Sequence, residues 1–200
     1  MGSNPLRRLS KGGCEAGEGR YCDGRVGGNV LTSEPIQHLD FRRATESDVD
    51  GMADAHRDSI LQLGSQYYVR AIVNDWAGVV SRRLYLDAMD RGEVFFIATG
   101  AVAGHQLILG FSSDYVISGT THGTSAYVRP QAARRRIGSR LLALSESFGR
   151  SRGATAVQIE ASLGAVEFYK RHGFVETTRG DVTLPSGFQM PCVFMRKELR

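Results

Sequence analysis

The stretch Y-V-R-P-Q-A-A-R-R-R-I-G-S-R-L-L, residues 127–142, decides how this chain is expected to fold. It opens within a short apolar run, residues 125–128, that is typical of a β-strand. It then passes through Pro130 into an arginine-rich turn. Apolar residues then recur at helical spacing, at Ile137, Leu141, Leu144 and Phe148. The stretch therefore predicts a strand that turns sharply into a helix.

The start of such a helix is a good place for an anion. Its first N–H groups have no partner within the helix and lie at the positive end of the helix dipole. Arg134, Arg135 and Arg136 add cationic donors there, and Gly138 has no side chain to keep a phosphate from the backbone. The turn predicts a pyrophosphate site, although this stretch alone is equally consistent with a solvated basic turn.

A second stretch, S-L-G-A-V-E-F-Y-K-R-H-G-F, occupies residues 162–174. Ser162 can cap a short helix over residues 163–172, and Gly173 can end that helix in a left-handed conformation. Phe168 and Tyr169 then lie near the end of the helix, which gives the tyrosine a defined position.

Together the two stretches resemble the two cofactor-binding segments of the GNAT superfamily of N-acetyltransferases, and the resemblance covers roughly residues 41–199. The first family segment reads Q/R-x-x-G-x-G/A and falls on residues 133–138, where Ala133 and Arg136 depart from it. The second often reads N-A-x-x-F-Y-x-x-x-G-F, and Gly164 stands at its asparagine. The positions that match the second segment are Ala165, Phe168, Tyr169, Gly173 and Phe174.

The resemblance implies acetyl-CoA as the acetyl donor, with no metal. The cofactor-binding residues that it implies are Tyr127, Val128, Arg134, Arg135, Arg136, Ile137, Gly138, Ser139, Gly164 and Phe168. The backbone of residues 135–138 would hold the pyrophosphate, and Val128 would pair with the pantetheine amides. A backbone N–H near Val128 would stabilise the oxyanion, whereas the lost asparagine at Gly164 removes one hydrogen bond to the pantetheine arm.

Two catalytic residues are expected, one from the resemblance and one from the residue pattern. Tyr169 resembles the family tyrosine that protonates the leaving sulfur, and an unperturbed tyrosine pKa near 10 keeps it protonated at neutral pH. A purely packing aromatic is the alternative. For the general base we choose Glu160, because it is the only acid on its predicted strand; Asp114 and His122 are further candidates. An ordinary solvated or hydrogen-bonded polar residue remains an alternative for each of the three.

Length and composition fit one soluble domain. The chain has 200 residues, of which 42% are hydrophobic, which is enough apolar material for a core. No apolar run approaches the ~20 residues needed to cross a bilayer, and the N-terminus lacks the apolar centre of a secretory signal. We therefore expect a cytoplasmic protein that has no membrane partner.

Cysteine usage and charge argue against two other classes of site. Two of the three cysteines, Cys14 and Cys22, fall in a segment without periodicity, so we expect neither a disulfide framework nor a metal site. The net charge of +4 is mild, and the arginine cluster makes few phosphate contacts without an aromatic stacking platform. We therefore expect no nucleic-acid partner.

The order of predicted elements gives the fold class. Residues 1–40 hold eight of the 24 glycines and are expected to be a disordered leader, followed by a GNAT domain over residues 41–200. Strands are expected at residues 41–44, 94–99, 106–115, 121–128, 156–161, 175–183 and 189–196. This order predicts an α+β domain with the GNAT-like acyl-CoA N-acyltransferase fold, in which helices flank both faces of a mixed, mostly antiparallel sheet.

Three helices are expected before the second strand. The first starts at a capping box of Thr45 and Asp48 and carries His56 on its apolar face, where a core histidine is the favoured interpretation over a substrate-facing one. The second holds residues 67–76 and the third residues 82–89. Four aromatics in this region are candidates for an acceptor pocket or for the core, namely Tyr67, Tyr68, Trp76 and Tyr85.

The functional hypothesis is an N-acetyltransferase that transfers an acetyl group from acetyl-CoA to a primary amine of a small molecule, by direct attack in a ternary complex. One alternative is acetylation of a protein N-terminus or lysine, which would need a more open acceptor groove. Another is a coenzyme A-binding module without catalysis, which the departures at Ala133, Arg136 and Gly164 keep open. We expect a monomer or homodimer.

Overall fold

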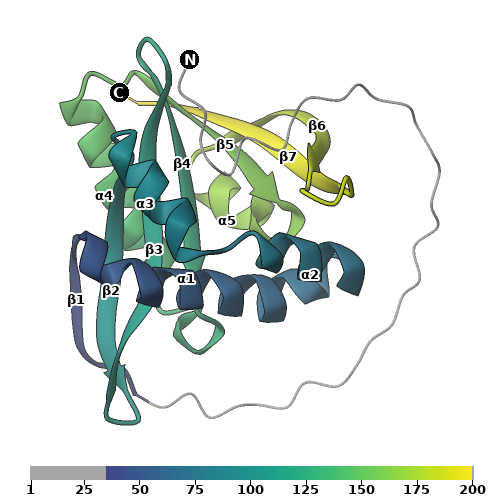
Figure 1. The fold of residues 1–200 in the computed structure, drawn as a ribbon. Helices are drawn as coiled ribbons and strands as arrows, with labels where there is room; N and C mark the ends of the chain where they lie inside the picture. Colours follow the sequence, from purple (N-terminus) through teal and green to yellow (C-terminus); the bar gives the residue numbers. More distant parts are fainter. Residues whose placement is uncertain (1–34, 200) are drawn as a thin grey trace.

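The computed structural model describes residues 35–199, so residues 1–34 of the predicted leader lie outside the described residues. Figure 1 shows one sheet of seven strands in the order β1-β2-β3-β4-β5-β7-β6. The strands are β1 (Gln37–Arg43), β2 (Val94–Val102), β3 (His105–Ser118), β4 (Thr121–Val128), β5 (Ala156–Ser162), β6 (Val175–Thr183) and β7 (Gln189–Glu198). Only β4 and β5 are parallel neighbours. The predicted mixed, mostly antiparallel sheet is confirmed.

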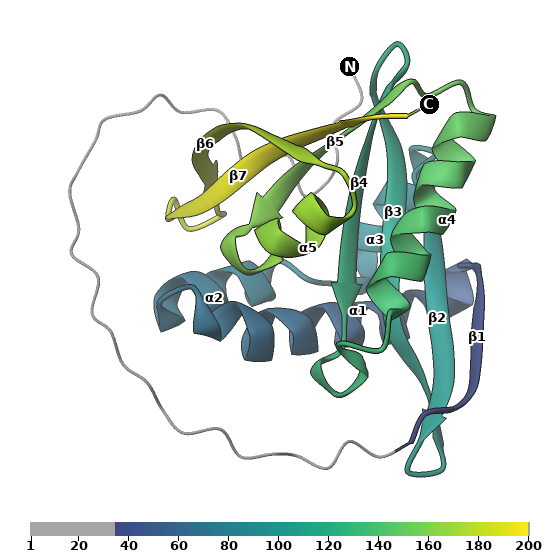
Figure 2. The same ribbon diagram turned by 180° about the vertical axis from the view of Figure 1, so that it is seen from behind.

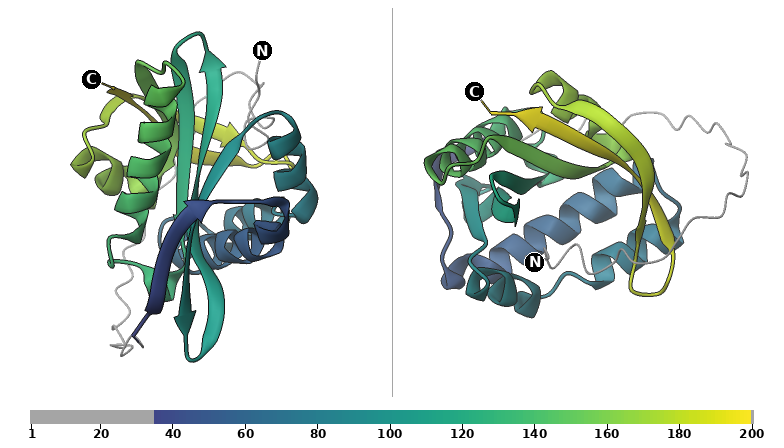
Figure 3. Two further views of the ribbon diagram at one scale, coloured as in Figure 1. Left: turned by 90° about the vertical axis from the view of Figure 1, so that its left-hand side faces the viewer. Right: turned by 90° about the horizontal axis from the view of Figure 1, so that it is seen from above.

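Helices cover both faces of this sheet, as predicted. Their bounds are α1 (Val49–Asp58), α2 (Arg70–Gly78), α3 (Arg82–Asp90), α4 (Ile137–Ser151) and α5 (Val166–Arg171). Helices α1, α2 and α3 lie on one face, and α4 and α5 lie on the other (Figures 2 and 3). No helix among residues 35–199 combines the length and the apolar character needed to span a membrane.

Several boundaries differ from the predictions. Strand β1 begins at Gln37 rather than residue 41, because residues of the expected leader pair with β2 through Gln37 and Asp40. Helix α2 begins only at Arg70, after a π-helical turn (Ser59–Leu63) and a 3-10 turn (Gly64–Gln66), so Tyr67 and Tyr68 precede the helix that was predicted to hold them. The helix predicted over residues 163–172 is a 3-10 turn (Leu163–Ala165) followed by α5.

The core has one cluster on each face of β2 and β3. Ile97 and Phe111 pack with the apolar residues of α1 and α3, whereas their near neighbours Ala98 and Leu109 pack with Ile137 and Leu141 of α4. Because successive side chains of a strand point to opposite faces, both faces of these strands are apolar and buried. The strands that frame the site are therefore held from both sides.

His56 is a core residue. Its Nδ1 lies 2.7 Å from the hydroxyl oxygen of Tyr85, and its ring centroid lies 3.8 Å from that of Tyr127. The side chain is 1% exposed, and Nε2 has no hydrogen-bond partner among the described residues. Burial lowers the pKa of His56 to about 3, so the ring is neutral in the folded protein at neutral pH.

This buried histidine predicts loss of stability in mild acid. In the unfolded chain this histidine has a pKa near 6.5, so below pH 6.5 it binds a proton there but stays neutral in the folded protein. The free energy of unfolding therefore falls as pH drops toward 3. His56→Phe should reduce the pH slope between pH 6 and 4.5 by about 1 kcal/mol per pH unit, measured by urea unfolding. His105→Gln, at an exposed position, is the control. An unchanged slope in His56→Phe would contradict the assignment.

Candidate functional site

The site begins where β4 and β5 separate. The two strands pair at only three positions, Thr121 with Ala156, His122 with Val157 and Gly123 with Gln158. Beyond these, β4 continues to its end still paired with β3 on its other side, but without a strand partner on the β5 side. One edge of the second half of β4 therefore presents backbone groups to a gap, and α5 lies beside that gap (Figure 2).

Tyr169 reaches into this gap from α5. Its hydroxyl oxygen accepts a hydrogen bond from the N–H of Ala126, 3.2 Å away, and the residue is only 2% exposed. Burial, with a smaller contribution from Tyr127, raises the pKa of Tyr169 above its usual value. The phenol therefore stays protonated at neutral pH, and because it accepts from Ala126 its own O–H remains a donor.

A cavity of about 520 Å³, here called the α4 cavity, lies between the end of β4, the start of α4 and the segment before α5. Nine of the ten cofactor-binding residues proposed from the sequence line it, which brings the two sequence stretches together at one place. These nine are Tyr127, Val128, Arg134, Arg136, Ile137, Gly138, Ser139, Gly164 and Phe168. Arg135 is not among its lining residues.

The turn into α4 has an unusual backbone. Arg134 and Arg136 both have a φ of 61°, a left-handed conformation that costs a non-glycine residue roughly 1–2 kcal/mol. The first N–H bonded within the helix is that of Arg140, to the carbonyl of Arg136, so the N–H groups of residues 137–139 have no helical partner. The left-handed backbone at Arg136 explains why a glycine suits that position of the family segment.

Gly164 lies directly under the ring of Tyr67. A Cβ atom at Gly164 would lie 2.6 Å from a ring carbon of Tyr67, closer than real Cβ atoms approach. Tyr67 is half exposed and also lines the α4 cavity, so its ring occupies the space above Gly164 that a side chain would need. The departure at Gly164 is thus matched to a residue far away in the sequence.

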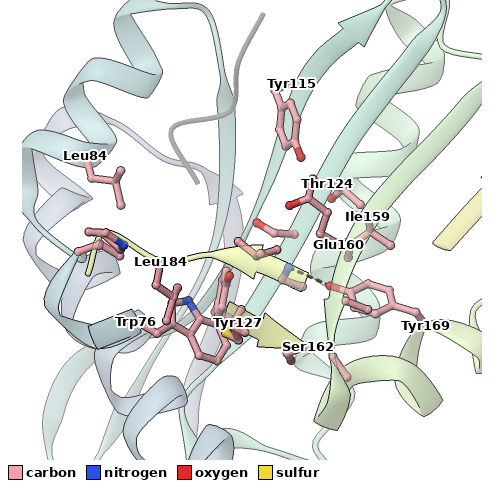
Figure 4. Close-up of a pocket in the computed structure, with 18 residues that line it drawn as sticks. Trp76, Leu84, Tyr115, Thr124, Tyr127, Ile159, Glu160, Ser162, Tyr169 and Leu184 are labelled. Carbon is pink, nitrogen blue, oxygen red and sulfur yellow. Dashed lines mark hydrogen bonds between the residues drawn. The ribbon is translucent and has the colours of Figure 1, made fainter. Parts of the chain in front are cut away.

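A second cavity, of about 230 Å³, is here called the hairpin cavity because the β6–β7 hairpin forms one wall of it (Figure 4). Trp76 of α2, Leu84 of α3 and Leu184 of the hairpin lie on one side of it, and Glu160 and Tyr169 lie on the other. The two cavities share five lining residues and so meet beside β4. The shared residues are Trp76, Ala126, Tyr127, Ser162 and Ala165.

Glu160 lines the hairpin cavity together with Tyr169. Strand alternation buries Val157 and Ile159 and turns Glu160 away from them, as the sequence pattern predicted. After burial itself, the charge of Glu160 is the main cause that raises the pKa of the Cys192 thiol to about 12. The two residues proposed as catalytic therefore share one cavity.

Asp114 and His122 lie elsewhere. His122 Nδ1 is 3.2 Å from both carboxylate oxygens of Asp114, and both side chains are buried. A Cβ atom at Gly149 of α4 would lie 3.0 Å from Asp114, which places the pair beneath that helix. Burial raises the pKa of Asp114. Neither residue lines the α4 cavity or the hairpin cavity, so the structure separates these two candidate bases from Glu160.

Sequence reasoning placed the acceptor-side aromatics only in part. Trp76 lines both cavities and Tyr68 lines the α4 cavity, but Tyr85 lies in the core against His56 and lines neither. The residues that it missed include six from β3, α3 and the β6–β7 hairpin, namely Tyr115, Leu84, Val182, Leu184, Pro185 and Met190. No motif marks these positions. Arg171, which lines the α4 cavity, lies within the stretch at residues 162–174 but was not among the predicted cofactor-binding residues.

Comparisons with known proteins support the family resemblance and the fold. Residues 91–176 match the family model described as an acetyltransferase (GNAT) domain. No curated protein is similar enough to the chain to count as a match.

Solved structures share the fold. A GCN5-related N-acetyltransferase from Rhodopseudomonas palustris superposes with a TM-score of 0.67 at 25% identity, covering 86% of this chain and 100% of its own. The PaiA N-acetyltransferase of Thermoplasma acidophilum in complex with coenzyme A superposes with a TM-score of 0.65 at 18% identity, covering 82% of this chain and 100% of its own. The acetyltransferase YncA of Salmonella typhimurium with acetyl-CoA superposes with a TM-score of 0.61 at 17% identity, covering 82% of this chain and 95% of its own.

The end of β4 depends on a close approach at Gly110 of β3, which predicts the effect of a substitution there. A Cβ atom at Gly110 would lie 2.6 Å from the carbonyl oxygen of Tyr127 and 3.1 Å from the Cα of Val128, both backbone atoms. Gly110→Ala should therefore destabilise the fold by about 1–3 kcal/mol, measured by chemical denaturation. Gly78→Ala, where no atom lies within 4 Å, should change stability little. Equal stability of the two variants would refute the close approach.

Proposed function

The chain belongs to the GNAT superfamily, and from that premise we propose that it transfers the acetyl group of acetyl-CoA to the primary amine of a small molecule, by direct attack in a ternary complex. The observation that supports this most is the meeting of two cavities beside Ala126 and Tyr127. One cavity holds the anion-binding turn, and the other holds a tyrosine and a carboxylate, so a donor and an acceptor can approach each other at β4.

The residues of the α4 cavity fit acetyl-CoA, which when bound supplies an activated acetyl thioester. The free N–H groups at the start of α4, with Arg134 and Arg136 beside them, suit a pyrophosphate. Arg171 offers a further cation at the same cavity. The unpaired edge of β4 offers backbone partners to the pantetheine amides, as a neighbouring strand would.

The backbone of β4 can stabilise an oxyanion. Alternate N–H groups of a strand point to the same edge, so the N–H of Val128 faces the gap on the same side as that of Ala126, which bonds Tyr169. A backbone N–H in this buried place stabilises developing negative charge more strongly than water does. We assign the oxyanion donor to Val128.

Tyr169 is the proposed proton donor to the departing sulfur. Its raised pKa keeps the proton on the hydroxyl oxygen, and that oxygen accepts from Ala126, a residue at which the two cavities meet. Burial raises the pKa of a thiol as well as that of a phenol, so the sulfur released in this place is a stronger base than in water.

Glu160 is the proposed base. An alkylamine is mostly protonated at neutral pH and must lose a proton before it can attack a thioester. Glu160 lines the cavity in which the amine would sit, whereas Asp114 and His122 lie beneath α4. The carboxylate of Glu160 takes this proton directly or through a water molecule.

The β6–β7 hairpin favours a small acceptor over a protein. Its turn is tied to α2, because Ser186 Oγ donates to Asp75 over 2.6 Å. Nearby, the Tyr68 hydroxyl donates to the carbonyl of Pro191 and accepts from the N–H of Leu163, both over 2.8 Å. These ties fix the hairpin as a wall of the hairpin cavity, whose volume of about 230 Å³ suits a small molecule better than a protein segment. A coenzyme A-binding module would have no use for Tyr169 and Glu160 in one cavity.

The cofactor assignment predicts a ligand-specific gain in stability. Excess acetyl-CoA at about 100 times its dissociation constant should stabilise the protein by ~2.7 kcal/mol, because it binds only the folded state. Thermal unfolding with and without acetyl-CoA measures this gain, and ATP is the polyphosphate control. An equal gain with ATP, or none with either ligand, would mean that the α4 cavity does not take acetyl-CoA.

The catalytic assignment predicts the effect of removing one hydroxyl. Tyr169→Phe should lower kcat by about 100-fold or more, because proton donation to the leaving group is lost, while the KM for acetyl-CoA changes little. Steady-state thiol release measures both constants. Tyr85→Phe removes another buried tyrosine hydroxyl, one that lines neither cavity, and should leave kcat unchanged. Wild-type kcat in Tyr169→Phe would leave Tyr169 a packing role only.

A further inference from the structure

The hairpin cavity points to a class of acceptor, which goes one step beyond the proposed function and rests on it. We propose that the acceptor is a small primary amine on an apolar, aliphatic or aromatic skeleton, with no second charged group at its far end. Three features of the cavity support this: the side chains that line it, the engagement of its hydroxyls, and the placement of its single carboxylate.

The lining is mostly apolar on the side away from β5. Leu84, Leu184 and Met190 contribute aliphatic surface, and Trp76 contributes an aromatic ring held in place by edge contacts with the rings of Tyr68 and Tyr127. Among the described residues that line this cavity there is no lysine, arginine or histidine. An acceptor carboxylate or phosphate would therefore meet no cation here.

Several hydroxyls that line the cavity already have partners within the protein. Thr124 Oγ1 donates to the carbonyl of Ser113 over 2.7 Å, and Ser125 Oγ lies 2.9 Å from Ser113 Oγ. The hydroxyl oxygen of Tyr169 accepts from Ala126. The hydroxyls of Thr124 and Ser125 are thus already bonded within the protein. The far side of the cavity is formed by apolar side chains such as Leu84 and Leu184, which suits a ligand that is polar at one end only.

Glu160 is the one carboxylate among the residues that line the cavity. It lies on the same side as Tyr169, whereas Leu84, Trp76 and Leu184 lie across the cavity (Figure 4). An ammonium group drawn to Glu160 is therefore beside Tyr169, whose hydroxyl oxygen accepts from Ala126 at the junction with the α4 cavity. Its carbon skeleton then extends toward Leu84 and Leu184.

This polarity discriminates between amines. A carboxylate at the far end of the acceptor would be buried against leucine without a counter-charge, and a second ammonium group there would lose its hydration in the same way. The cavity volume of about 230 Å³ is at the small end for ligand sites, so the acceptor skeleton is short. Apolar monoamines are the class that meets none of these penalties.

A matched panel of amines tests the proposal. Hexylamine, 6-aminohexanoate and 1,6-diaminohexane share one carbon chain and differ only at the far end, and 2-phenylethylamine adds an aromatic skeleton. With saturating acetyl-CoA, kcat/KM from thiol release should be about 100-fold higher for hexylamine or 2-phenylethylamine than for the two doubly functional amines. Calorimetric binding of each amine to the protein saturated with coenzyme A should give the same order of affinity.

A variant at the far wall tests where the skeleton lies. Leu84 is half buried, so Leu84→Lys can be accommodated, and it should raise kcat/KM for 6-aminohexanoate relative to hexylamine by about 10-fold, because it supplies the missing cation. Leu84→Met, a matched apolar substitution, should leave the ratio unchanged. The melting temperature of each variant shows whether it is folded.

The outcomes separate this inference from the function on which it rests. Faster acetylation of 6-aminohexanoate or 1,6-diaminohexane than of hexylamine would overturn the acceptor class and leave the acetyltransferase assignment standing. An unchanged preference in folded Leu84→Lys would also overturn the placement of the skeleton. Stabilisation by acetyl-CoA, with no release of coenzyme A thiol in the presence of any of the amines, would overturn the proposed catalysis and the acceptor class together.

Discussion

The separation of β4 from β5 is the constraint on which the rest of the structure depends. After Gly123 one edge of β4 has no strand partner, and buried backbone N–H and carbonyl groups cannot remain unsatisfied without a cost in free energy. One of these groups is satisfied within the protein, since the Tyr169 hydroxyl accepts a hydrogen bond from the N–H of Ala126. The rest of the edge faces the α4 cavity, where an amide-bearing ligand can complete it.

The surroundings of this edge hold it in place. Arg129, which follows β4, forms an ion pair with Asp58 at the end of α1 and donates to the carbonyl of Ile108 on β3 over 2.8 Å. On the other face, Ile137 and Leu141 anchor α4 in a buried cluster with Leu109. The end of β4 and the start of α4 are thus fixed relative to each other, so little ordering is needed before a ligand binds between them.

Positive and negative groups lie in different parts of the site. Arginines and free N–H groups gather at the start of α4, whereas the hairpin cavity has one carboxylate and an apolar far wall. In the proposed function, an anionic donor and a cationic acceptor would therefore be drawn to different cavities, which meet at Ala126 and Tyr127. The buried pair of Asp114 and His122 takes no part in this division and instead supports the packing of α4 on the sheet.

The sequence alone indicated the order of the strands and helices and nine of the residues that line the α4 cavity, because those signals are local. An arginine-rich turn between a strand and a helix, and a tyrosine near the end of a short helix, each lie within one stretch of about 15 residues. It also indicated Glu160 through strand alternation. Only the tertiary structure decided the rest. The wall of the hairpin cavity depends on two long-range contacts: Ser186 with Asp75, which are 111 positions apart, and Tyr68 with Pro191, which are 123 positions apart. Tyr67, which covers Gly164, is also far from it in the sequence. Local patterns report only on near neighbours, so no periodicity could show which distant side chains would close a cavity.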